Sequence, residues 1–315
     1  MGIKLMIINP RREEDMVGIK PCEKMKLFWD PSYYCNGKCI YCFTDSLNEK
    51  SFLSDKQLKK VSLFIDQMQV EKVSIGGGEP FLSEFTKICK YINKESCISV
   101  TTNGTICNDE IINTIIRYNI NITVSLDSLN PDYYNVVRKG IELNKVLESI
   151  QKLASSQEIR SKLSIRTTVN KYNQNELKGI VDFCVENKIT NLKINSTNLY
   201  GRAKCNKEII LEFNLFLDKL KQLKEYARKY NNILRLELPI EKYLDDLLQK
   251  CTLGKNSLYL DPYGNVFPCA FSEKRLCLGN VYLDTIEDII RSVETFSHIN
   301  HICQKCPIHR YEKNR

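Results

Sequence analysis

Strand-like and helix-like segments alternate from Met25 to about Asn195, and this alternation constrains the fold more than any other sequence feature. The strand-like segments are short and apolar, whereas the segments between them carry apolar residues at helical spacing. Such alternation predicts β/α units joined into a parallel sheet, with the chemistry at the carboxyl ends of the strands. We therefore expect an α/β fold with a partial (β/α)6 barrel, whose strands cover residues 25–29, 72–75, 98–101, 121–126, 163–169 and 191–194.

Cysteine is unusually frequent, at 14 of 315 residues, in a composition that otherwise suits a cytoplasmic globular protein. No apolar run approaches the ~20 residues that span a bilayer, and the N-terminus has no cleavage-like signal site. In a reducing compartment, clustered cysteines more often bind metal or perform redox chemistry than form disulfides. The net charge of +8 comes from scattered lysines rather than a basic block, so we expect no membrane partner and disfavour nucleic acid.

The first cysteine cluster has the spacing C-x3-C-x2-C and follows the first predicted strand. Cys35, Cys39 and Cys42 stand on this loop, which Gly37 allows to curl around a ligand. Three thiolates are one short of the four that saturate a [4Fe–4S] cluster, so one iron would stay open for a substrate. Structural zinc usually takes a fourth protein ligand, and the neighbouring sequence supplies no such residue.

This spacing, with Tyr41 just before the last cysteine, resembles the signature of the radical S-adenosylmethionine (SAM) superfamily. The resemblance implies that the open iron binds the amino and carboxylate groups of SAM. It also implies that an electron from the cluster splits SAM to give a 5′-deoxyadenosyl radical. A flavodoxin or ferredoxin is the electron donor that we expect.

Further matches to this family stand at the ends of later strands. The segment Gly76–Pro80 resembles the Gly-Gly-Glu motif whose backbone receives the amino group of SAM. Ser125 matches a serine that contacts SAM, and Arg138 matches an arginine that pairs with its carboxylate, a task suited to a guanidinium. Asn103 and Arg166 also lie at or near strand ends, but they are weaker candidates for binding SAM. The implied cofactor-binding set is Tyr41, Gly77, Gly78, Glu79, Ser125 and Arg138.

A second group of cysteines lies toward the C-terminus. Segments 257–260 and 265–267, joined by Asp261-Pro-Tyr-Gly264, have the composition of a β-hairpin that could bring Cys251 near Cys269. A C-x2-C pair at Cys303 and Cys306 could complete a site of four thiolates, and such a site suits either zinc or a [4Fe–4S] cluster.

The spacing of this second group resembles the auxiliary-cluster appendage of radical SAM enzymes, in the shortened "twitch" form of the SPASM domain. The resemblance favours one auxiliary [4Fe–4S] cluster over zinc and implies the ligands Cys251, Cys269, Cys303 and Cys306. Cys277, in a loop nearby, is a weaker candidate. We expect an N-terminal extension over 1–24, the barrel over 25–205, bridging elements over 206–250 and the auxiliary domain over 251–315. The bridging elements that we predict are a helix over 207–230, a strand over 233–238 and a helix over 240–249.

The motifs specify the cofactor chemistry more closely than the substrate. A ribosomally made peptide is the substrate we favour, because peptide-modifying enzymes dominate the relatives with such appendages. Few residues precede the first strand, so a leader-peptide-binding domain would be a separate protein. The cysteine spacing also suits a radical dehydrogenase acting on a small aminocyclitol, and a non-catalytic zinc protein or an RNA-modifying enzyme are further alternatives. Ala270 stands where sulfatase-maturing relatives place an acidic base, and we assign no catalytic base.

Overall fold

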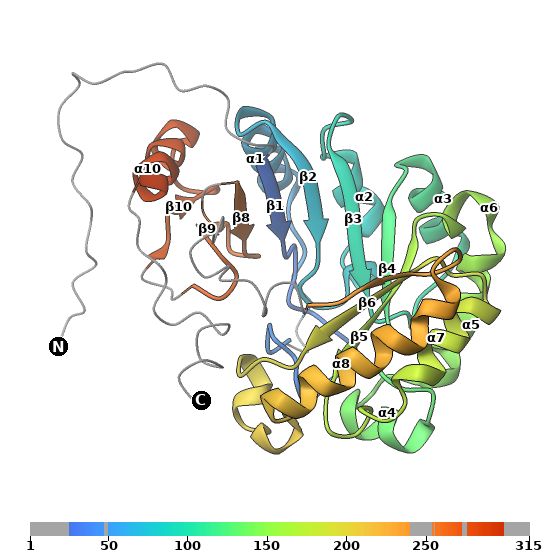
Figure 1. The fold of residues 1–315 in the computed structure, drawn as a ribbon. Coiled ribbons are helices and arrows are strands. Elements are labelled where there is room, and N and C mark those ends of the chain that lie inside the picture. Colours follow the sequence, from blue (N-terminus) through green and yellow to red (C-terminus); the bar gives the residue numbers. More distant parts are fainter. Residues whose placement is uncertain (1–24, 47–49, 240–253, 255, 273–275, 299–315) are drawn as a thin grey trace.

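The computed structural model describes residues 25–46, 50–239, 254, 256–272 and 276–298. Their strands form one ten-stranded sheet in the order β10-β9-β8-β1-β2-β3-β4-β5-β6-β7 (Figure 1). Strands β1 to β6 are all parallel to their neighbours, which confirms the predicted partial barrel. They are β1 (Met25–Trp29), β2 (Val70–Ile75), β3 (Cys97–Thr102), β4 (Asn121–Ser125), β5 (Leu163–Val169) and β6 (Asn191–Ser196).

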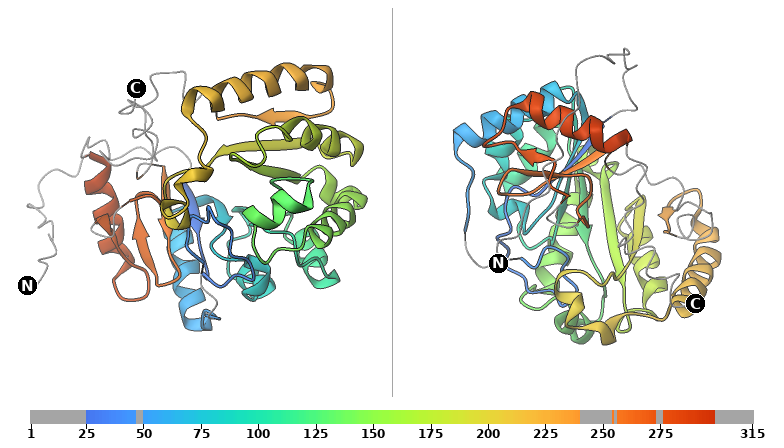
Figure 2. Two further views of the ribbon diagram at one scale, coloured as in Figure 1. Left: turned by 90° about the horizontal axis from the view of Figure 1, so that it is seen from below. Right: turned by 90° about the vertical axis from the view of Figure 1, so that its left-hand side faces the viewer.

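Helices between these strands cover the outer, convex face of the sheet (Figure 2). The strand residues that face them are apolar and fully buried, as Val73 and Ile75 are on β2, so the core lies between sheet and helices. Ser54 caps the first helix through a capping box with Gln57. The helices are α1 (Asp55–Gln67), α2 (Phe85–Lys90), α3 (Asp109–Arg117), α4 (Pro131–Val137), α5 (Leu143–Ser155), α6 (Gln157–Arg160) and α7 (Leu177–Glu186).

The segment after β6 departs from the prediction of one helix over 207–230. A 3-10 turn at Lys207–Ile209 precedes α8 (Phe213–Ala227), which packs against α7. The break has a packing cause, because Ile209 is buried in a small cluster with Ile40 and Val137 and accepts a hydrogen bond from the Lys171 amide. Strand β7 (Arg235–Glu237) then pairs in parallel with β6, so the barrel sheet extends beyond the predicted six strands.

The C-terminal hairpin joins the opposite edge of the barrel sheet. Strand β8 (Ser257–Leu260) runs parallel to β1, and β9 (Asn265–Phe267) returns antiparallel to it, which confirms the predicted hairpin. Strand β10 (Gly279–Asn280) and helix α10 (Ile286–His298) complete this part. The carboxylate of Asp261 holds the turn by accepting hydrogen bonds from the amides of Tyr263 and Asn265.

Some predicted features lie outside the described residues. They are the N-terminal extension, a helix expected at 240–249, and the candidate ligands Cys251, Cys303 and Cys306. Among the described helices, none is both long and apolar enough to cross a membrane.

Candidate functional site

The loop that carries Cys35, Cys39 and Cys42 leaves the carboxyl end of β1 and lies against the glycine turn that follows β2. The amide of Gly78 donates to the Ser32 carbonyl at 2.8 Å, and the Glu79 amide donates to Tyr34 at the same distance. A Cβ atom at Gly78 would collide with the Tyr34 carbonyl. The glycine therefore permits the close approach of two backbones at this point.

The Glu79 side chain is buried and fully hydrogen bonded. Its carboxylate accepts from the Thr102 hydroxyl at 2.6 Å, the Asn103 amide at 2.6 Å and the Phe81 amide at 3.1 Å. Burial raises the pKa of Glu79, and these donors oppose that rise. The carboxylate thus ties the turn after β2 to the turn after β3.

Tyr41 and Arg138 meet in a buried polar cluster that Asp127 organises. The Tyr41 hydroxyl donates to Asp127, and Arg138 Nη1 lies 3.1 Å from the same carboxylate, with side chains 5% and 1% exposed. Arg138 Nε is buried and has no hydrogen-bond partner within the described part of the chain. One edge of the guanidinium is therefore used within the protein, while Nε could still meet an acceptor on a ligand. Ser125, at the end of β4, is half-buried.

Two residues in turns that follow other strands hold the cysteine loop, and the sequence analysis missed one of them and ranked the other low. Arg202 donates through Nε to the Cys39 carbonyl at 2.9 Å and through Nη2 to Ser46 Oγ at 3.0 Å. Asn103 donates to Asn36 at 2.8 Å. The only sequence signal for Arg202 is its place in a Gly-Arg pair after a predicted strand. This signal could not identify its partners, which lie more than 150 residues away in sequence.

The three thiols of the loop differ in how readily they ionise. Burial raises the pKa of Cys39 to about 11 although the Arg138 charge opposes it, and burial also raises the pKa of Cys35. Burial acts in the same direction on Cys42, but hydrogen bonds from Ser46 and Thr44 outweigh it and lower the pKa of Cys42. Cys42 is thus the thiol best prepared to act as a thiolate ligand.

The loop fits an iron–sulfur cluster in its chemistry, because three cysteines lie within electrostatic range of one another beside a cationic Arg138. In the described ranges, no three potential ligand side chains stand at metal-binding distances. The thiols would therefore have to turn inward to hold a metal. The unpartnered Nε of Arg138 nearby suits a carboxylate-bearing ligand such as SAM.

The fold brings Cys269 close to this loop. Phe43, which follows Cys42, packs against Phe271 with ring centroids 4.8 Å apart, and Tyr200 packs against both rings. A cavity of about 180 Å³ opens between the loop and the hairpin, and its wall includes Cys269 and Ala270. Cys277 is exposed and donates to the Gly279 carbonyl. Of the predicted auxiliary ligands, Cys269 is the one within the described residues.

Comparisons with known proteins agree with both cysteine regions. The sequence matches the radical SAM superfamily over residues 29–184 and the SPASM iron–sulfur cluster-binding domain over residues 251–307. The subtilosin biosynthesis protein AlbA of Bacillus subtilis is 26% identical over 271 residues, which are 83% of this chain and 58% of AlbA. The mycofactocin maturase MftC of Mycolicibacterium smegmatis is 24% identical over 82% of this chain and 67% of MftC.

The chain therefore spans less than two thirds of the length of AlbA. Among solved structures, Streptococcus suis SuiB bound to its precursor peptide SuiA superposes with a TM-score of 0.68 at 17% identity. That superposition covers 91% of this chain and 70% of SuiB. At this level of identity, the likeness shows that the two proteins share a fold.

Proposed function

Because the chain belongs to the radical SAM superfamily and carries an iron–sulfur cluster-binding domain of the SPASM type, we propose that it uses SAM to modify a ribosomally made peptide. The observation that carries the proposal is the pairing of both domains in one chain whose relatives include a bacteriocin biosynthesis protein and a maturase. SuiB, which shares the fold, was solved with a precursor peptide.

In this proposal Cys35, Cys39 and Cys42 hold the first [4Fe–4S] cluster, and Cys251, Cys269, Cys303 and Cys306 hold the second. When bound, the first cluster and SAM supply a 5′-deoxyadenosyl radical that takes a hydrogen atom from the substrate. The backbone at Gly77 and Gly78 receives the amino group of SAM. Arg138 Nε and Ser125 receive its carboxylate, since both belong to strands or loops at the mouth of the barrel.

The remaining residues of the site position these groups and exclude water. Asp127 fixes Arg138 and Tyr41, and Arg202 fixes the cysteine loop from the far side. Phe43 and Tyr200 line the cavity between the two cysteine regions, and Phe271 packs against both of their rings. An apolar wall suits radical chemistry because it limits side reactions with solvent. A flavodoxin or ferredoxin supplies the electron.

The proposal is tested with anaerobically reconstituted protein, reductant and SAM. We expect 5′-deoxyadenosine to form, and deuterium to pass into it from a deuterated candidate precursor peptide. A Cys42→Ala variant serves as the control, and it should form no 5′-deoxyadenosine above the level without protein. Deuterium transfer from an aminocyclitol rather than from a peptide would overturn the peptide assignment and leave the radical chemistry in place.

A further inference from the structure

The concave face of the barrel sheet is polar where the convex face is apolar. On β2, Lys72 and Ser74 alternate with the buried Val73 and Ile75, so the polar pair faces inward. The hydroxyls of Ser74 and Ser99 share a hydrogen bond of 2.9 Å across β2 and β3, which confirms that they lie on one face. We call this inner surface the lumen face.

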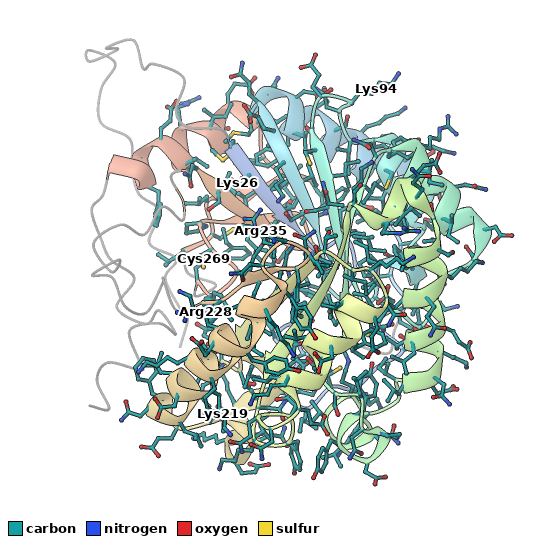
Figure 3. All side chains as sticks on the ribbon, turned by 45° about the vertical axis from the view of Figure 1, so that its right-hand side comes forward. Lys26, Lys94, Lys219, Arg228, Arg235 and Cys269 are labelled. Carbon is teal, nitrogen blue, oxygen red and sulfur yellow. The ribbon has the colours of Figure 1, made fainter. Side chains whose placement is uncertain are left out.

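The lumen face gathers cations. On β5 and β6, Arg166 and Lys193 are register partners, and Lys193 is in turn the partner of Glu237 on β7. The same alternation places three more cations on this face. In Figure 3, Lys26 and Arg235 lie near the middle of the view, whereas Lys94 lies at its top and Lys219 lies on α8 near its bottom. The cations of the lumen face are Lys26, Lys72, Arg166, Lys193 and Arg235.

Among the residues that the structure describes, acidic side chains do not balance this charge. Glu237 is the acid that faces Lys193 and Arg166, and it also pairs with Arg235 at 3.6 Å, where both side chains are well exposed. Such an exposed pair contributes little. Lys72 and Lys193 have no ion-pair partner in the part of the chain that the structure describes. Burial, together with the nearby Arg166, Lys72 and Arg235 charges, lowers the pKa of Lys193.

Arg166 is the residue least explained by the fold alone. Its Nη1 donates to the Thr101 hydroxyl at 3.2 Å, but its Nε is enclosed and has no hydrogen-bond partner among the residues that the structure describes. Arg166 is half-buried, and an enclosed donor such as its Nε is costly unless an acceptor completes its hydrogen bonds. Arginine pairs best with the two oxygens of a carboxylate or phosphate. A lysine-rich but fully solvated surface would not bury such a group.

Resting on the proposed function, we propose that the lumen face binds an acidic side chain of the peptide substrate, with Arg166 and Lys193 as its direct partners. The modified residue of the peptide then lies toward the mouth of the barrel, where the cysteine loop stands. Lys26, Lys72 and Arg235 add a field that attracts an acidic segment and aligns it with the sheet.

The test uses the full chain and a fluorescein-labelled dodecapeptide of alternating glutamate and serine, beside the same peptide with glutamine. Fluorescence anisotropy reports binding to the protein with and without its clusters. We expect the glutamate peptide to bind about tenfold or more tightly than the glutamine peptide, the effect of one charge-assisted hydrogen bond. Arg166→Gln and Lys193→Met should each weaken the glutamate peptide by a similar factor of about ten.

The matched controls are Arg228→Gln, just after α8, and the exposed Lys94→Met, which should leave the affinity unchanged. A misfolded Arg166→Gln protein would also bind the peptide weakly, so a second lumen variant is needed. Lys72→Met serves this purpose, because Lys72 is exposed and its replacement removes a charge alone. Equal binding of the two peptides, or unchanged affinity in the lumen variants, would overturn the inference. Inorganic tripolyphosphate is a further probe. If it bound through Arg166 and the glutamate peptide did not, the inference would be overturned, because the lumen face would then be a phosphate site.

The two proposals fail in different ways. The glutamate peptide could bind through Arg166 in a protein that transfers no deuterium to 5′-deoxyadenosine from any precursor peptide. This result would contradict the proposed function alone. Modification of a neutral peptide without dependence on Arg166 would sink the lumen inference alone.

Discussion

The two cysteine regions are anchored by different means. The loop of Cys35, Cys39 and Cys42 is held by buried polar groups from distant parts of the chain, chiefly Asp127 and Arg202. The loop at Cys269 instead follows a hairpin that is added to the sheet edge, and β8 is bound to β1 by a parallel ladder. The first region therefore depends on a hydrogen-bond network, and the second depends on continuity of the sheet.

Removal of a cysteine from each region should produce the largest and most contrasting effects. Cys39→Ala should abolish SAM cleavage and remove about half of the bound iron, because three ligands hold the first cluster. Cys269→Ala should remove the other half of the iron. It should leave unchanged the rate of SAM cleavage that is measured in the absence of substrate. Iron analysis and 5′-deoxyadenosine formation, measured side by side, check both results. Loss of cleavage in the Cys269 variant would show that the two regions do not hold separate clusters.

The buried pair of Asp127 and Arg138 belongs to the hydrogen-bond network that holds the first cysteine region, and its removal should lower the stability of the protein. Asp127→Ala leaves the Arg138 charge buried without its partner, which costs about 3–5 kcal/mol. The double variant Asp127→Ala/Arg138→Met should recover much of this loss, because no buried charge remains. Urea denaturation of the cluster-free protein gives both values. A double variant as unstable as the single one would locate the cost in the lost Tyr41 and Thr168 contacts instead.

Asp30 lies at the seam between the regions, where Tyr259 of β8 donates to its carboxylate at 2.7 Å. Burial raises the pKa of Asp30 from 3.8 to about 7, and the nearby Asp261 adds to this effect. Between these two pKa values the folded state keeps a proton that the unfolded state has lost, so stability falls as pH rises through this window. Above about pH 7 both states have lost the proton and the dependence ends.

Asp30→Asn should remove this pH dependence. From pH 5 to pH 8 the wild type should lose roughly 2–3 kcal/mol relative to the variant, the equivalent of about two pKa units. Tyr259→Phe is the companion variant, since it keeps the acid and deletes the hydroxyl that donates to it. Parallel stability curves for wild type and Asp30→Asn would contradict a protonated Asp30 in the folded state.

Periodicity predicted the parallel strands and the hairpin well, because burial of one face imposes a regular pattern that is local in sequence. The candidate cofactor residues followed from short motifs that are equally local. The Arg202 contact and the seam at Asp30 were not predictable, since their partners come from distant segments that only the fold brings together. The helix expected at 207–230 was too long for a related reason, because burial of Ile209 against Ile40 is a tertiary effect that helical spacing does not register.

The smallest expected effects come from helix caps, and they test whether the two regions unfold as one. Ser54 caps α1 on the barrel, and Thr285 accepts a hydrogen bond from the Asp288 amide at the start of α10. Replacement of either residue by alanine should cost about 1 kcal/mol. Because the β1–β8 ladder joins the regions, both variants should shift one common denaturation midpoint, seen alike by circular dichroism and by tyrosine fluorescence. If Thr285→Ala instead shifted a separate, earlier transition while Ser54→Ala shifted only the later one, the hairpin would be an independent unit, and the sheet ladder would not couple the two cysteine regions.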